Sequence, residues 1–436
     1  MDSIERKILS VIDSRAEELQ ALAQDLYSHA EQGYHEYRTA QVVSDCLKKL
    51  GLETREGLAI TGLRASVGKT DGPNVALIGE LDGLACPTHP MATEKGFAHS
   101  CGHYAQIVCM LGAAMALTDP EVAASLDGTA TFFAVPAEEF QGADLRDEVR
   151  RTHDVHCAGG KCELLRRGEF DDIDMAVTTH SLMVDRESGV DLMLGNSKCT
   201  GFIGKTVLIH GRASHAAAAP HLGVNALNAA CLGMSALGMV RETFQEKDCV
   251  RVHPYLRKGG EAINIVPSEA VVDMMVRANN QEAIEAVSTK VDNCFKGAAM
   301  AIGCDVDIIN AQGYMPCPER LPDDILWDCA GLLGDELKVK SIPAGACNTA
   351  STDVGDLFAV MPVLNFTFGG SSGDLHSKDY TVSNSTTAHI LPAKMMALLA
   401  YRLLKNGAAE AKKIIDGYQA TYTRDEYKAY TQKMSG

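Results

Sequence analysis

The stretch NVALIGELDG, residues 74–83, joins an unbroken apolar run to two acidic residues. A short apolar run of this kind is typical of a strand that is buried on both faces. TATFFAVPAEE (129–139) and DMAVTTHSL (174–182) repeat the arrangement, and an apolar helical stretch, GHYAQIVCMLGAAMAL (102–117), lies between the first two runs. This alternation predicts an α/β domain whose sheet is flanked by helices.

From about residue 199 the pattern changes to strand, helix, strand, strand, helix, strand. The six segments are KTVLIHG, NALNAACLGMSALGMV, DCVRVHPYL, AINIVPSEAVVDMMVRA, QEAIEAVSTKVDNCFKGAAMAIG and CDVDIIN. This β-α-β-β-α-β order predicts a small ferredoxin-like domain.

After this unit the chain returns to the first domain, with a strand at VLNFTF (363–368) and a closing apolar helix. We therefore expect one domain formed by residues 1–198 and 313–436, with a second domain, residues 199–312, inserted in it. Two domains also suit a chain of 436 residues, because a single hydrophobic core stops growing at roughly 250–300 residues.

Composition restricts the class of partner. The chain has 40 Lys and Arg against 57 Asp and Glu, a formal net charge of −17, which argues against nucleic acid and against an anionic membrane. A small-molecule substrate is more compatible with this negative charge than either of these partners. The first residues, MDSIERKILSVIDSRAEEL, include no apolar signal region, and the fourteen cysteines are scattered. We expect a cytoplasmic protein with reduced thiols.

Several polar residues follow the apolar runs where the predicted strands end. Asp82 follows the first run, Glu138 and Glu139 follow the second, and His180 follows the third. Ligands of open α/β sheets bind at the carboxyl ends of the strands, so we expect these four side chains to converge on one crevice. Two adjacent acids are usually a solvated pair, but at a strand end they also suit one metal ligand and one general base.

The sequence HSCGH places Cys101 and His103 at the start of the predicted helix 102–117. A helix N-terminus favours a thiolate, which binds metal. Thiolate, imidazole and carboxylate donors together suit zinc or a neighbouring transition metal. Taken alone, each residue is more often structural than a ligand, the cysteine as a buried thiol and the histidine as a capped surface imidazole.

Eight motifs in order carry a resemblance to a known family: GELDGL, HSCGH, VPAEE, TTHSL, GRASHAAAAPHLGVNALNAA, INIVPSEA, STDVGD and LHSKDY. With them the chain resembles the di-metal hydrolases of the aminoacylase and glutamate carboxypeptidase type, peptidase family M20. Within its amidohydrolase branch, the chain is most similar to aminobenzoyl-glutamate hydrolases and β-alanyl-lysine-type dipeptidases. The resemblance implies a catalytic domain with a mixed sheet flanked by helices and an inserted ferredoxin-like lid that forms a homodimer.

The resemblance also implies a ligand set for two divalent metal ions, zinc or manganese, with cobalt and nickel as further candidates. Cys101 would bridge the two ions. His103 and His180 would complete one site, and Glu139 and His376 the other.

The remaining roles follow from the same resemblance. Glu138 would be the general base, and Asp82 would orient a metal ligand. In the lid, His215 would reach a neighbouring active site to polarise the scissile carbonyl, while Asn264 and Arg277 would bind a carboxylate of the substrate. A planar guanidinium is well suited to a carboxylate.

These observations predict a metal-dependent amidohydrolase for an N-acyl amino acid, an aminobenzoyl-glutamate-like compound or an unusual dipeptide. Two departures from the family pattern need an explanation. Tyr104 replaces the usual Asp or Asn, and it is the one feature in favour of the alternative, a catalytically silent binding homologue. Glu80 stands where related branches have a histidine ligand, and we interpret it as structural. A thiol enzyme that uses Cys101 is a third hypothesis.

Overall fold

The computed structural model describes residues 1–139, 142–182 and 189–434. The chain divides into two compact units. Unit 1 contains Met1–Ser197, Pro318–Ala346 and Asp356–Lys428, and unit 2 contains Lys198–Cys317, Cys347–Gly355 and Ala429–Gly436. The catalytic and lid roles, and the domain boundaries given above, stay predictions.

Unit 1 is built on an eight-stranded mixed sheet. In spatial order its strands are β1 (Arg55–Leu58), β2 (Gly62–Gly68), β6 (Thr129–Val135), β3 (Asn74–Glu80), β7 (Met175–Ser181), β16 (Val363–Phe368), β8 (Leu192–Leu194) and β14 (Val339–Ser341). The central strands β6, β3, β7 and β16 are parallel, whereas β2 and β8 run antiparallel to their inner neighbours. The three apolar runs of the sequence form β3, β6 and β7, so the predicted α/β sheet is confirmed.

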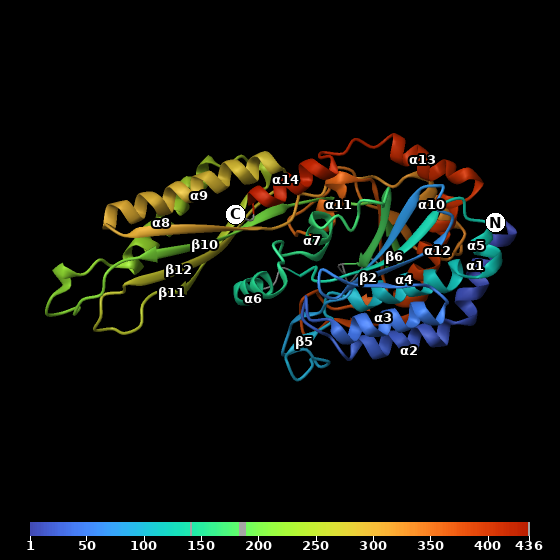
Figure 1. Cartoon of the computed structure of the whole chain (residues 1–436), viewed down its shortest axis with the longest axis horizontal. Helices are drawn as coiled ribbons and strands as arrows, with labels where there is room; N and C mark the ends of the chain where they lie inside the picture. Colours follow the sequence, from blue (N-terminus) through green and yellow to red (C-terminus); the bar gives the residue numbers. More distant parts are fainter. Residues whose placement is uncertain (140–141, 183–188, 435–436) are drawn as a thin grey trace. The chain divides into compact units, whose positions relative to one another are not determined.

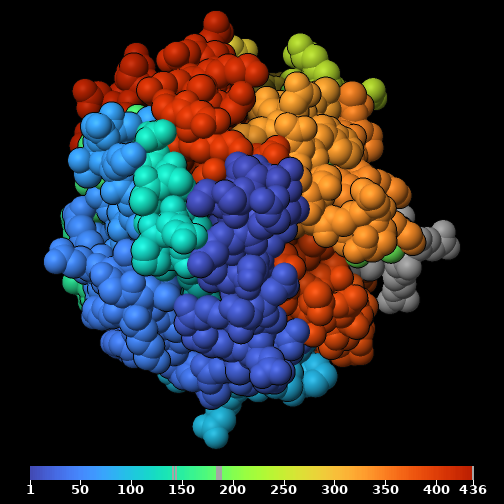
Figure 2. Space-filling view, turned by 90° about the vertical axis from the view of Figure 1, so that its right-hand side faces the viewer, coloured from blue at the N-terminus to red at the C-terminus, as the bar shows by residue number. Residues whose placement is uncertain are grey.

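The helix α4 (His103–Leu117) is the centre of the core of unit 1, since all 15 of its residues are buried. It packs against β3 and against α12 (Leu391–Leu404). The N-terminal helix α1 (Ser3–Ser14) contacts both α4 and α12. Figure 2 shows the blue N-terminal segment beside orange and red C-terminal segments. Arg402 of α12 binds the Glu5 carboxylate of α1 at 2.8 Å. Helices α1 and α12 thus both pack against α4, which itself packs against β3.

Shorter elements complete the chain. Further α-helices of the described residues are α2 (Ala16–Tyr27), α3 (Tyr37–Lys49), α5 (Pro120–Ala124), α6 (Ala143–His153), α7 (Gly160–Arg166), α10 (Asp324–Gly331), α11 (Val354–Val360), α13 (Ala409–Asp416) and α14 (Arg424–Met434). The two-residue strands are β4 (Leu84–Ala85), β5 (Phe97–Ala98), β9 (Lys198–Cys199), β15 (Cys347–Asn348), β17 (Ser371–Ser372) and β18 (Thr381–Val382). In the described part of the chain no helix combines the length and the apolar character that a membrane span requires.

Unit 2 has the predicted ferredoxin-like order. Its elements are β10 (Gly201–His210), α8 (Ala226–Val240), β11 (Arg251–Lys258), β12 (Glu269–Ala278), α9 (Gln281–Ile302) and β13 (Asp305–Gln312). The strands form an antiparallel sheet in the order β11-β12-β10-β13, and α8 and α9 cover one face of it (Figure 1). The third strand is shorter than expected, since residues 262–268 lie outside it. Pro267 has no amide hydrogen for a strand ladder.

Candidate metal centre

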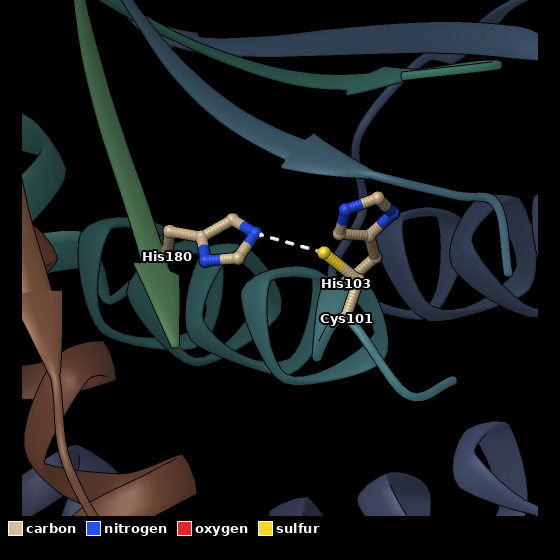
Figure 3. A group of neighbouring side chains, drawn as sticks. All are labelled: Cys101, His103 and His180. Carbon is tan, nitrogen blue, oxygen red and sulfur yellow. Dashed lines mark hydrogen bonds between the residues drawn. The ribbon is translucent and has the colours of Figure 1, made fainter. Parts of the chain in front are cut away.

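The carboxyl ends of three parallel strands meet at one edge of the sheet of unit 1, as the sequence predicts. His180 lies near the end of β7, and the chain beyond β6 carries Glu138 and Glu139. The start of α4 brings a thiol to the same edge, where Cys101 Sγ lies 3.4 Å from His180 Nε2 (Figure 3). On its other side Cys101 Sγ lies 3.2 Å from Nε2 of His376, which comes from a loop after β17.

Two groups of potential donor atoms share Cys101. Each group has one donor atom per residue, and these atoms lie within 4.8 Å of one another. The first group is Cys101, His103 and His180, and the second is Cys101, Glu139 and His376. The structure thus brings together the five residues that the resemblance implies as ligands, in the same two sets. Their role as ligands stays a prediction.

Asp82 fixes the orientation of the His103 ring. His103 Nδ1 lies 2.9 Å from the main-chain oxygen of Asp82 and 3.1 Å from its Oδ1. Asp82 Oδ2 accepts a hydrogen bond of 3.0 Å from the main-chain N–H of Glu139. Within residues 1–139, 142–182 and 189–434, the buried Nε2 of His103 has no hydrogen-bond partner. A nitrogen aimed into a cluster of thiol and carboxylate donors fits a divalent metal ion.

The glycine between Cys101 and His103 is required by the backbone. Gly102 has φ of +87°, which side chains rarely adopt. A Cβ at this position would also overlap Ser181 Oγ. Glycine therefore allows the turn that directs the thiol and the imidazole on either side of it to the same cluster.

Electrostatics favour a thiolate at Cys101. Burial and the charge of Glu139 raise the pKa of this thiol, but His103 and His180 outweigh them and lower the pKa to about 6. Burial lowers the pKa of both histidines, whereas the thiolate of Cys101 raises them, that of His103 well above its usual value. Hydrogen bonds to Cys101 and Glu139 raise the pKa of His376 to about 11. In the metal-free cluster these shifts favour a Cys101 thiolate paired with the imidazolium forms of His103 and His376.

These protonation states predict that metal uptake releases protons. An imidazolium must lose its proton to coordinate a metal, whereas a thiolate has already lost its own. We therefore expect about two protons per chain at pH 7, one each from His103 and His376, whose pKa values are raised most. Calorimetric titration with Zn²⁺ in buffers of different ionisation enthalpy measures this number. His376→Gln is expected to reduce it by about one, and a binding heat that does not depend on the buffer would contradict the prediction.

Glu36 is a buried acid near the site that the sequence does not reveal. Burial and the nearby Asp82 raise its pKa to about 8. Its Oε1 accepts a hydrogen bond of 2.8 Å from the main-chain N–H of Ala137, and its Oε2 accepts one of 2.5 Å from Thr61. Ala137 has φ of +49°, so Glu36 supports the strained turn that precedes Glu138. The contact joins residues about a hundred positions apart, and no local pattern marks it.

Tyr104 is buried in the core of unit 1. Its hydroxyl lies 3.2 Å from His389 Nε2, and its ring packs against Tyr27 at 4.9 Å and His99 at 5.6 Å between centroids. None of these partners is a candidate metal ligand. His389 lies on a π-helical turn, Thr386–Ile390, which leads into α12. The tyrosine at position 104 therefore has a partner on the turn that leads into α12.

We expect Tyr104→Phe to keep its full metal content. Loss of the hydroxyl removes one buried hydrogen bond, which costs about 1 kcal/mol of unfolding free energy. Urea unfolding measures the change in unfolding free energy, and elemental mass spectrometry measures the metal content. Tyr104→Asn, which restores a residue usual in the family, leaves a cavity and should destabilise the fold by about 3 kcal/mol or more. A Tyr104→Phe protein that lost metal would show that the hydroxyl acts on the metal centre.

The three candidate residues His215, Asn264 and Arg277 belong to unit 2. His215 Nδ1 accepts hydrogen bonds from the main-chain N–H groups of Ala217 and Ala218, at 3.2 and 3.1 Å. These bonds select the tautomer whose Nε2 carries the proton, so the exposed ring presents a donor.

Asn264 is also exposed and lies beside His215, since its carbonyl accepts a bond of 3.0 Å from the N–H of Ala216. Arg277 on β12 donates a bond of 2.7 Å to Ser351 Oγ and lies over the ring of Phe202. Local structure is thus consistent with a donor at His215, while the substrate-binding roles of Asn264 and Arg277 stay predictions.

Several known proteins are similar to this chain in sequence or in fold. Residues 199–301 match the family described as the peptidase dimerisation domain. The Xaa-Arg dipeptidase of Mus musculus is 28% identical over 92% of this chain and 89% of its own length. A component of the p-aminobenzoyl-glutamate hydrolase of Escherichia coli is 28% identical over 75% of this chain and 64% of its own length. A Bacillus subtilis protein described as a dinuclear metal binding peptidase of the M20 family superposes with a TM-score of 0.64, at 19% identity over 90% of this chain and 99% of its own.

Proposed function

We propose, from the premise that this chain is related to M20 family hydrolases over most of its length, that it is a metal-dependent amidohydrolase. Its substrate is an N-acyl amino acid, an aminobenzoyl-glutamate-like compound or an unusual dipeptide. The observation that carries the proposal is the pair of donor groups that share Cys101. The names of the two relatives, a dipeptidase and an aminobenzoyl-glutamate hydrolase, support the same bond type.

Two divalent ions fit the donor groups, and we propose zinc or manganese, with cobalt and nickel as further candidates. His103 and His180 would hold one ion, Glu139 and His376 the other, and Cys101 both. When bound, such ions make water nucleophilic near neutral pH and polarise the scissile carbonyl.

Glu138 is our candidate for the general base. Its Oε2 lies 3.8 Å from His103 Nε2, within the cluster but outside the two groups that share Cys101. The carboxylate takes the proton of the attacking water and then delivers it to the leaving amine. Asp82 keeps the His103 ring in place during both steps.

The finer assignments concern unit 2 and the location of the protein. We propose that unit 2 forms a homodimer, which the match to a dimerisation domain supports. His215 would donate from Nε2 to the oxyanion, and Asn264 and Arg277 would bind the substrate carboxylate. A cytoplasmic location belongs to the same proposal.

A substrate panel tests the function. The purified protein, loaded with Mn²⁺, Zn²⁺ or Co²⁺, is assayed for amine release from aminobenzoyl-glutamate, β-alanyl dipeptides and N-acyl amino acids. We expect turnover of at least one class, loss of turnover with a chelator and recovery on metal addition. Absence of turnover in a fully loaded protein contradicts the proposal. Turnover that survives chelation but not alkylation points to Cys101 as a nucleophile.

A further inference from the structure

A lysine is buried beside the candidate metal centre. Lys161 on α7 is inaccessible to solvent, and its Nζ lies 2.5 Å from Glu80 Oε1 at the end of β3. The second oxygen of this carboxylate, Oε2, accepts a hydrogen bond of 2.7 Å from Gln106 Nε2 in the first turn of α4. A buried charge pair is tolerated only where its hydrogen bonds are satisfied, and both oxygens of Glu80 have a donor.

The same carboxylate lies within reach of a metal ion on His103. Glu80 Oε2 is 3.3 Å from His103 Nε2, closer than the 3.8 Å of Glu138 Oε2. Two donors bound at about 2.0–2.1 Å to a tetrahedral ion are roughly 3.3 Å apart. Glu80 Oε2 therefore lies from His103 Nε2 at the separation of two ligands of one ion. Glu80 nevertheless belongs to neither donor group that shares Cys101, and both of its oxygens already accept hydrogen bonds from the protein.

The charges around Glu80 indicate how the site would change if Lys161 were lost. The thiolate of Cys101 and the carboxylates of the cluster are anionic, whereas Lys161 is the cation paired with Glu80. Without this lysine the Glu80 carboxylate would be a buried charge without its counter-ion. The nearest positive charge would then be a metal ion on His103.

We propose that Lys161 holds Glu80 out of the coordination sphere of the ion on His103, and so keeps a coordination position open for water and substrate. Catalytic metal sites need such an open position. Lys161 is thus a positioning residue that acts through Glu80. The inference rests on the proposed function, because it requires a metal ion at His103. It also explains why a lysine is buried at this position.

Co²⁺ titration of Lys161→Met tests the proposal, because the absorption of Co²⁺ reports its coordination number without substrate. We expect two ions per chain, with the ion on His103 bound about tenfold more tightly and absorbing more weakly because a ligand has been added. The rate constant kcat should fall about 10–100-fold, a loss of the size that mutations in the surroundings of a metal site typically cause. The double variant Lys161→Met/Glu80→Gln should regain the wild-type absorption.

Lys205→Met is the matched control. Lys205 is also buried and binds a carboxylate, with Nζ 2.7 Å from Asp292 Oδ1, but it lies in unit 2, which holds none of the five candidate ligands. We expect this variant to lower the free energy of unfolding and to leave the Co²⁺ absorption unchanged. A folded Lys161→Met protein with wild-type absorption, or one that no longer binds Co²⁺, overturns the proposal.

Glu80→Gln gives a second test if Lys161→Met does not fold. Because Glu80 is not a ligand in the proposal, this variant should bind two Co²⁺ ions with the absorption and affinity of the wild type. A folded Glu80→Gln protein that binds fewer ions shows that Glu80 is a resident ligand and overturns the proposal. If the wild type binds Co²⁺ but hydrolyses nothing, the proposed function fails while these spectra still decide the role of Lys161.

Discussion

Cys101→Ala will remove both metal ions and lower kcat/KM by about 10⁴-fold or more, since metal activation contributes several kcal/mol and each 1.4 kcal/mol is tenfold in rate. The reason is geometric. Cys101 Sγ belongs to both donor groups, so its loss leaves only two donors in each. Its pKa of about 6, set by burial and Glu139 against His103 and His180, also makes it the anionic donor of the first group. Elemental mass spectrometry should find two ions per chain in the wild type and close to none in the variant.

Cys109→Ala is the matched control for this result. Cys109 is a buried thiol on the same helix α4, and it contacts Met396 in the core. Burial raises its pKa well above the usual value, so it stays a neutral thiol. We expect a modest loss of stability and an unchanged metal content. A Cys101→Ala protein that still held two ions would refute the bridging role.

The fold follows from patterns that are local in the sequence. The apolar runs of β3, β6 and β7 are buried on both faces, and such runs predict central parallel strands directly. Unit 2 shows strand and helix periods clearly enough to give the β-α-β-β-α-β order. The expected strand over 262–278 was too long, because apolar residues on either side of Pro267 suggest one run while the proline interrupts the ladder.

The candidate site was predictable to the extent that it lies at strand ends. Asp82, Glu138, Glu139 and His180 converge because neighbouring parallel strands finish at one edge of the sheet. His376 stands in a loop with φ of +61°, and only the family resemblance indicated it. That resemblance is confirmed by the relatives, whereas the individual roles of the residues await experiment.

Contacts between distant segments explain what the sequence could not reveal. Lys161 looks like an ordinary solvated lysine of a short helix, yet its partner Glu80 stands 81 positions earlier. Glu36 likewise meets Ala137 across 101 positions. A single sequence gives the periodicity of each element but not the pairing of side chains between elements. Buried charges beside a site are therefore found only once the elements are placed.

Substitutions at the adjacent acids Glu138 and Glu139 should affect catalysis and metal binding separately. We expect Glu138→Gln to keep two ions and to lower kcat by about 10²–10⁴-fold, the usual contribution of a general base. Glu139→Gln should instead lose the ion of the second group. Burial raises the pKa of the Glu139 carboxyl, but His376, with Nε2 3.1 Å from Glu139 Oε1, together with His103 and Cys101 outweighs burial and lowers it, so the anion is ready to bind metal.

Metal content and single-turnover rates, measured on both variants with the same substrate, distinguish the two roles. The structure also indicates what the loss of a metal ion in Glu138→Gln would mean. Glu138 forms a third group of neighbouring donors with His103 and Glu139. If Glu138→Gln loses one ion, Glu138 is a ligand of that group and cannot move freely to carry a proton. The general base would then be another group within reach of the attacking water. Glu80 is not that group, because its carboxylate is bound by Lys161 and Gln106.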